Sequence, residues 1–130
     1  MKPIPTIVLA AALLSLVGCG SSSTSVTTPT PKMVMVEVLD FSYDPKSIQI
    51  NRGDTVRWVL VGMDTTHTVT ALSGAFDSGF IFLQPGDFYD RTFNQDNVTF
   101  EYSCQTHKAC CMMQGSVRVG SGAPSPIPGY

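Results

Sequence analysis

Histidine is scarce in this sequence: its 130 residues include only two, and there is a single tryptophan. Eight lysine and arginine residues face ten acidic ones, so the chain has no excess of positive charge. This weak acidity, without a basic stripe, argues against nucleic acid as a partner. The sequence also lacks a convincing set of nucleophile, base and acid, because no third group stands out that could orient a base. An enzyme is therefore the least favoured function class.

Long apolar runs are also lacking. The longest, residues 4–17, is short for a transmembrane helix, which needs about 20 apolar residues. Its place behind Lys2 is typical of a signal peptide. The run ends in LVGC (16–19), which resembles the lipobox of bacterial lipoproteins and implies cleavage before Cys19 and lipid attachment to it. The protein would then be periplasmic or otherwise extracytoplasmic, anchored through Cys19; the alternative is an ordinary signal peptide with a coincidental cysteine.

The segments at the two ends of the remaining chain have too few apolar side chains to join a core. Serine, threonine and proline dominate residues 20–31, and residues 120–130 are similar. Such segments cannot offset their ordering entropy, so we interpret them as a flexible tether and a flexible tail. We therefore expect a signal peptide (1–18), a lipidated cysteine with its tether (19–31), one folded domain (32–119) and a tail (120–130).

The central region lacks the helical period over more than a turn or two, and it has no internal repeat. Its apolar residues alternate with the period of two that is typical of strands. Short strands separated by turn residues predict an all-β fold, an antiparallel sandwich or barrel. We expect strands at 33–39, 47–51, 55–61, 88–93, 98–104 and 115–119, with turns at 52–54 and 83–87. The expected core consists of Val36, Ile48, Ile50, Val56, Trp58, Phe76, Phe93, Phe100, Tyr102 and Val117.

One loop, CQTHKACCMM (104–113), concentrates three cysteines, a histidine and two methionines in ten residues. Thiolate, imidazole and thioether donors together favour copper over magnesium or calcium. The loop lies between two expected strands, which would hold both of its ends. Its candidate ligands are Cys104, His107 and a methionine. A second imidazole can come only from His67, the one other histidine of the chain.

A series of motifs runs in order through the domain. FSYDP (41–45), GDTVRW (53–58) and HTV (67–69) come first, and the spacings Cys104-x-x-His107 and Met113-x-Gly115 follow. Together they resemble the cupredoxins, the plastocyanin- and amicyanin-like blue copper proteins. The resemblance covers about residues 41–119. It implies an antiparallel Greek-key β-sandwich that holds one copper ion and cycles it between Cu(I) and Cu(II).

The resemblance also implies a ligand set. Cys104 corresponds to the thiolate ligand, and His67 and His107 correspond to the equatorial imidazoles. A methionine would be the weak axial ligand: the glycine that follows it in the family pattern indicates Met113, whereas the plastocyanin interval after the histidine indicates Met112. We prefer Met113, because the glycine sets how the loop returns to the sheet. His107 would lie near the surface, in an apolar patch, and provide the route for electrons.

Cys110 and Cys111 have no counterpart in that pattern. If Cys19 carries lipid, three cysteines remain, so at least one thiol stays outside an internal disulfide. Three interpretations of the pair follow in order of preference. The two residues are reduced and act as small hydrophobic side chains, or they form a vicinal disulfide, or one of them replaces methionine as a copper ligand.

These features predict a monomeric electron carrier with a mononuclear type 1 copper site, tethered to a membrane. Its partners would be redox proteins such as a cytochrome or an oxidoreductase. The alternative is storage, delivery or resistance, with Cu(I) held by the additional cysteines and methionines. A third possibility is a metal-free sandwich that serves as an adhesion or structural module, which stoichiometric copper uptake would exclude.

Overall fold

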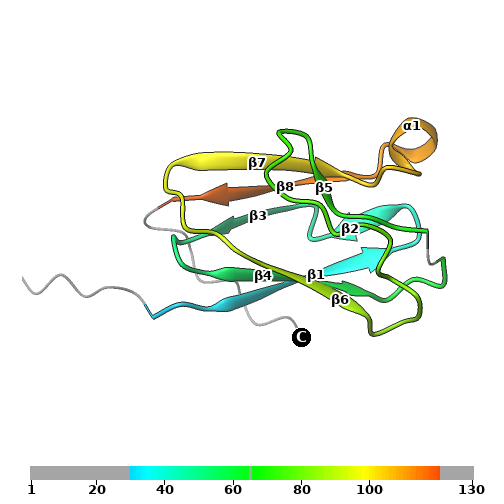
Figure 1. Cartoon of the computed structure of the whole chain (residues 1–130), viewed down its shortest axis with the longest axis horizontal. Helices are drawn as coiled ribbons and strands as arrows, with labels where there is room; N and C mark the ends of the chain where they lie inside the picture. Colours follow the sequence, from blue (N-terminus) through cyan, green and yellow to red (C-terminus); the bar gives the residue numbers. More distant parts are fainter. Residues whose placement is uncertain (1–29, 65, 121–130) are drawn as a thin grey trace, which may run out of the picture.

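The structure, a computed structural model, describes residues 30–64 and 66–120. The expected signal peptide, Cys19, most of the tether and most of the tail lie outside the described residues. Eight strands and one short helix follow each other along the described part of the chain (Figure 1). They are β1 (Met33–Leu39), β2 (Ser42–Asp44), β3 (Ser47–Ile50), β4 (Thr55–Leu60), β5 (Thr70–Ala71), β6 (Phe88–Thr92), β7 (Val98–Ser103), α1 (Lys108–Cys111) and β8 (Gln114–Val119).

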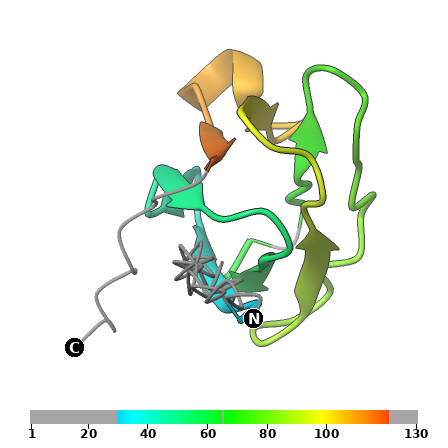
Figure 2. The ribbon, with the colours of Figure 1, turned by 90° about the vertical axis from the view of Figure 1, so that its left-hand side faces the viewer.

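The strands form two four-stranded sheets, with the orders β2-β1-β4-β6 and β3-β8-β7-β5. Figure 1 shows the sheets as two layers, and Figure 2 views them from the end opposite α1. The predicted all-β sandwich is therefore confirmed. The pairing is mixed, however, because β1 pairs with β4 and β3 pairs with β8 in parallel. Between β1 and β4 the chain crosses to the other sheet at β3 and returns, so β4 re-enters beside β1 in the same direction.

Alternating burial along the strands builds the core between the sheets. Every second residue of β1 and of β4 is buried, as the period of two predicts. Trp58 is fully buried, and its ring packs against those of Phe76 and Tyr102. The predicted core residues are buried, with one exception: Ile48 is only partly buried and packs against the cluster.

Differences from the expected elements are small. The two predicted turns contain glycines with positive φ, Gly53 at 92° and Gly86 at 98°, a conformation that glycine adopts without steric cost. The short strands β2 and β5 and the single turn α1 were not among the elements expected from the sequence. No helix in the described part of the chain is long and apolar enough to cross a membrane.

The segments that contain the candidate ligands lie at one end of the sandwich. β4 and β7 end there, and β8 begins there, next to α1 (Figure 1). Two of the connections at this end are residues 61–69, between β4 and β5, and residues 104–113, between β7 and β8. The fold thus brings the two histidine-containing segments to the same end of the molecule.

Candidate metal centre

The two ends of the loop 104–113 are held by the sheet. Cys104 directly follows β7, and Met113 directly precedes β8. The Cys104 amide donates a hydrogen bond of 3.0 Å to the Met113 carbonyl, which continues the β7–β8 pairing by one step. A Cβ atom on Gly115 would lie 2.5 Å from the hydroxyl oxygen of Tyr102, so only glycine allows this close approach. This explains why a glycine stands two residues after Met113.

Between these ends the loop forms one helical turn. The Lys108 amide donates to the Cys104 carbonyl, and the Cys111 amide donates to the His107 carbonyl, each over 3.1 Å. The turn leaves residues 108–112 exposed to solvent. His107 stands just before the turn, and its side chain is 13% exposed. The loop therefore has buried ends and an exposed middle.

His67 comes from the other connection and is fully buried. The Gln105 amide donates a hydrogen bond of 3.0 Å to the hydroxyl oxygen of Thr68, and this bond ties the two connections together. The Tyr43 hydroxyl donates to the carbonyl of the same threonine, and the Val69 amide donates to Ser78. These contacts leave the His67 backbone little freedom to shift, which is what a preorganised ligand requires.

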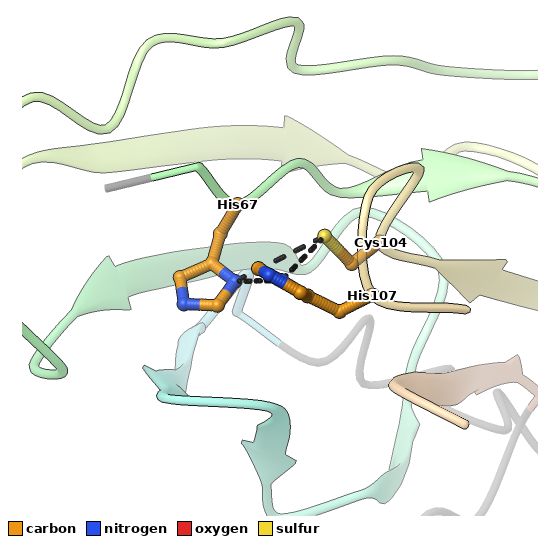
Figure 3. Close-up of side chains that lie close together, drawn as sticks. All are labelled: His67, Cys104 and His107. Carbon is orange, nitrogen blue, oxygen red and sulfur yellow. Dashed lines mark hydrogen bonds between the residues drawn. The ribbon is translucent and has the colours of Figure 1, made fainter. Parts of the chain in front are cut away.

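The side chains of His67, Cys104 and His107 converge (Figure 3). The two Nδ1 atoms lie 3.1 Å apart, and the Cys104 sulfur lies 3.9 Å from Nδ1 of His67 and 3.6 Å from Nδ1 of His107. Within residues 30–64 and 66–120, this is the one group of at least three histidine, cysteine or acidic residues whose donor atoms lie close enough for a metal ion. Two imidazole nitrogens and one sulfur form the donor set that suits copper. The residues therefore fit a copper ion.

Burial keeps His67 suited to metal binding. It lowers the pKa of this imidazole, so the ring is neutral near neutral pH, which is the form that binds a metal. The opposite nitrogen, Nε2, is buried without a hydrogen-bond partner and lies 4.0 Å from a carboxylate oxygen of Asp40.

The second histidine has a carboxylate on its outer side. The Nε2 atom of His107 lies 3.3 Å from an oxygen of Asp64. The other Asp64 oxygen accepts hydrogen bonds from the amide and the hydroxyl of Thr66, which lower the pKa of the carboxyl and keep it ionised. The Asp64 amide in turn donates to Asp40. Neither aspartate could be recognised from the sequence, because nothing in their spacing from the ligands distinguishes them from other loop acids.

The sulfur of Cys104 is fully buried and has polar neighbours. The hydroxyl of Thr106 lies 3.1 Å from it, and the carbonyl oxygen of Thr66 lies 3.8 Å away. Polar groups at this distance modify the electron density on a metal-bound sulfur.

The two candidate methionines differ sharply in burial. The side chain of Met113 is 1% exposed, and that of Met112 is 69% exposed. Met112 closes α1 with a positive φ of 52°, and this conformation reverses the chain so that the next residue points into the core. The loop therefore directs the side chain of Met113 inward and that of Met112 into solvent.

The interpretation of Cys110 and Cys111 that we preferred is wrong. The two residues are not reduced, packed side chains: both are exposed, and a disulfide joins them. Neither sulfur belongs to the group formed by His67, Cys104 and His107. Adjacent residues in a single exposed turn have no core to enter, which explains why hydrophobic packing does not occur here.

The surface next to His107 is part apolar and part acidic. The ring of Phe41 meets the imidazole edge-on, with ring centroids 5.0 Å apart, and its side chain is 48% exposed. The Asp64 carboxylate contacts the Nε2 atom of the same histidine. The expected apolar surrounding is thus accompanied by a fixed negative charge that the sequence analysis did not anticipate.

Residues 31–120 match the sequence model of one protein family, the copper binding proteins of the plastocyanin/azurin family. Among solved structures, a mutant plastocyanin of fern is 22% identical, with a TM-score of 0.51, and the match covers 66% of this chain and 99% of that one. A purple cupredoxin from Nitrosopumilus maritimus is 21% identical, with a TM-score of 0.53 and coverage of 65% and 97%. A reduced amicyanin mutant is 23% identical, with a TM-score of 0.52 and coverage of 67% and 81%. At these identities the solved structures support the fold.

Proposed function

Because the chain belongs to the plastocyanin/azurin family of copper binding proteins, we propose that it is an electron carrier with one copper ion held by His67, Cys104 and His107. The convergence of two imidazole nitrogens and one buried sulfur at one end of the sandwich carries the proposal. When bound, copper supplies a one-electron couple between Cu(II) and Cu(I). The residues of this chain hold the site, exclude water and tune its potential.

Met113 would be the fourth, weakly bound ligand of the proposed site. Its burial supports this choice over Met112, since a ligand must point toward the group of donors inside the fold. A thioether in this position binds weakly and helps to set the potential. Hydrogen bonds at both ends of the loop support a geometry that changes little between oxidation states, and small rearrangement is what fast electron transfer needs.

Electrons would leave and enter through His107. Its imidazole is the partly exposed member of the three, whereas His67 and Cys104 are fully buried. A redox protein that docks over Phe41 would come within contact of this ring. A carrier has no need of turnover chemistry at the site, and both histidines of the chain would be held by the metal, so we propose no enzymatic activity.

A visible absorption spectrum and a redox titration of the copper-loaded protein test the proposal. We expect one copper per chain, an intense absorption that depends on the bond between copper and the cysteine sulfur, and a reversible one-electron couple. A colourless protein that holds only Cu(I), with no reversible couple, would instead indicate storage or delivery. Met63 and Met112, two of the exposed methionines, would then add ligands, and metal analysis would give more than one copper per chain.

We also propose that the protein acts outside the cytoplasm, as a monomer on a lipid anchor at Cys19. The domain 32–119 would then be joined to the membrane by the tether 19–31 and followed by the tail 120–130. The support is the LVGC motif behind the apolar run. The variant Cys19→Ala should move the protein from the membrane fraction to the soluble fraction. If the variant still fractionates with membranes after carbonate washing, the anchor lies elsewhere.

A further inference from the structure

Cys110 and Cys111 form a second sulfur centre in the loop that also carries Cys104 and His107. We propose that this pair is a thiol–disulfide exchange site, which takes two electrons from the dithiol of a protein of the thioredoxin class. The proposal does not depend on copper electron transfer, because the sulfurs of the pair lie outside the group of metal donors.

The position of the disulfide argues against a structural role. Both cysteines lie in α1, and their sequence separation is one residue. A disulfide stabilises a fold mainly by closing a long loop in the unfolded chain, and two adjacent residues close almost none. It also joins no two separate elements. Because this disulfide contributes so little to folding, a role in thiol–disulfide exchange explains it better than a structural role.

Both sulfurs belong to exposed residues, and this is what exchange requires. α1 contains no buried residue, and Cys110 and Cys111 are each exposed. Exchange proceeds when an incoming thiolate reaches a disulfide sulfur along the bond axis, so access limits the reaction. Cys104, the other described cysteine, is fully buried and free. Burial thus separates Cys104, which a metal can reach, from Cys110 and Cys111, which an incoming thiolate can reach.

The surroundings accommodate the reduced form. The Cys110 sulfur lies 3.6 Å from the carbonyl oxygen of His107, so after reduction this thiol has an acceptor within reach. The pair can therefore exist in both states without rearrangement of the sheets.

The reaction balances as a dithiol–disulfide exchange. A thiolate of the partner attacks one sulfur of the pair, the Cys110–Cys111 bond breaks, and a mixed disulfide forms. The second thiolate of the partner then attacks the mixed disulfide and releases the reduced pair. Two electrons and two protons pass to Cys110 and Cys111, and the partner leaves with a disulfide.

The sequence offers a direct way to follow the pair. Trypsin cleaves after Arg91, Lys108 and Arg118, so Cys104 falls in the peptide 92–108, and Cys110 and Cys111 fall together in the peptide 109–118. Copper-loaded protein is first reduced with ascorbate, which brings the metal to Cu(I) and leaves disulfides intact. It is then equilibrated with a thioredoxin-class protein in buffers of reduced and oxidised dithiothreitol. Free thiols of the native protein are alkylated with excess maleimide near neutral pH, before the protein is unfolded and digested, and the peptides are weighed.

We expect the peptide 109–118 to pass from no labelled thiol to two as the dithiol fraction rises. Metal analysis should still find one copper per chain, and Cys104 should stay unlabelled. A thioredoxin-class protein whose second cysteine is replaced by serine should remain joined to the wild-type chain as a mixed disulfide, and the variant Cys110→Ser/Cys111→Ser should not be joined to it. Two labelled thiols in the air-equilibrated wild-type protein would overturn the proposal. So would a pair that stays oxidised in native protein under buffers that reduce it in urea.

Discussion

The loop 104–113 has two regions of opposite character. Its ends, Cys104 and Met113, are buried and joined by a backbone hydrogen bond, whereas residues 108–112 form an exposed turn. Both regions contain sulfur, but the buried sulfur lies against two imidazoles and the exposed sulfurs lie against each other. Burial thus decides which sulfur is available to a metal and which to a thiol reagent. Cysteine therefore has two different roles at positions 104 and 111, which are only seven residues apart.

Removing the buried sulfur should have the largest effect. The variant Cys104→Ser replaces a soft thiolate with a hydroxyl, so we expect the intense visible absorption and the reversible couple to disappear. The spectrum of the copper-loaded variant and a redox titration measure this. Cys110→Ser is the matched control, since it removes a sulfur from the exposed region and should keep the colour. Loss of colour in both variants would contradict the distinction between the two regions.

Removing the carboxylate behind His107 should weaken the site without abolishing it. Asp64 lies 3.3 Å from Nε2 of His107, and such a contact fixes which ring nitrogen carries the proton and leaves Nδ1 free for the metal. We expect Asp64→Asn to lower copper affinity roughly 10- to 100-fold, the range for loss of such partners. Competition with a Cu(I) chelator measures the affinity, and thermal unfolding of the apoprotein checks the fold.

Asp77→Asn is a control for the Asp64 variant, because this aspartate is bonded to Thr70 and Gln105 rather than to a histidine. An equal loss of affinity in both variants would show that Asp64 acts through the net charge of the loops and not through the position of the imidazole.

Two methionine variants distinguish the buried Met113 from the exposed Met112 as the copper ligand. Met113→Leu removes a thioether that donates electrons to Cu(II) more than to Cu(I), so the potential should rise. We expect a rise on the order of 59 mV or more, which corresponds to a tenfold change in the ratio of the two affinities. Met112→Leu changes a side chain that is 69% exposed and should shift the potential little. Voltammetry of both proteins decides, and the reverse result would identify Met112 as the ligand.

Acid should destabilise the metal-free protein through His67. Burial lowers the pKa of this histidine in the folded state, so the unfolded chain binds the proton more readily. The stability is present above the unfolded pKa of about 6.5 and is lost as the pH falls from there through the lower folded pKa. Urea unfolding of the apoprotein at about pH 7.5 and about pH 5.5 measures the difference. His67→Gln should reduce this pH dependence; an unchanged slope would assign it to another group.

The smallest effect is expected from the exposed region. The double variant Cys110→Ser/Cys111→Ser removes a disulfide that closes almost no loop, so the free energy of unfolding should change by no more than about 0.5 kcal/mol. The colour and copper stoichiometry should stay. Urea unfolding measures the stability, and the absorption spectrum measures the colour. The single variant Cys110→Ser is measured in parallel. A large loss of stability would mean that the pair is structural after all.

Much of the fold could be read from local patterns. The alternation in β1 and β4 follows directly from the period of two, because successive side chains of a strand point to opposite faces. Turn glycines such as Gly53 and Gly86 were likewise recognisable, since their positive φ needs a residue without a side chain. The parallel pairings β1–β4 and β3–β8 could not be read in this way. They depend on which sheet each strand joins, and local patterns do not contain that information.

The donor types of the site were set by the sequence alone: one loop that holds a cysteine, a histidine and methionines at fixed spacing, and one further histidine in the whole chain. Tertiary structure decided the rest. It brought His67 next to Cys104 across 37 residues, buried Met113 while exposing Met112, and put Asp64 behind His107. It also left Cys110 and Cys111 in solvent, joined to each other. The physical reason is that spacing along the chain limits which atoms can meet, but burial and contact depend on the whole packed fold.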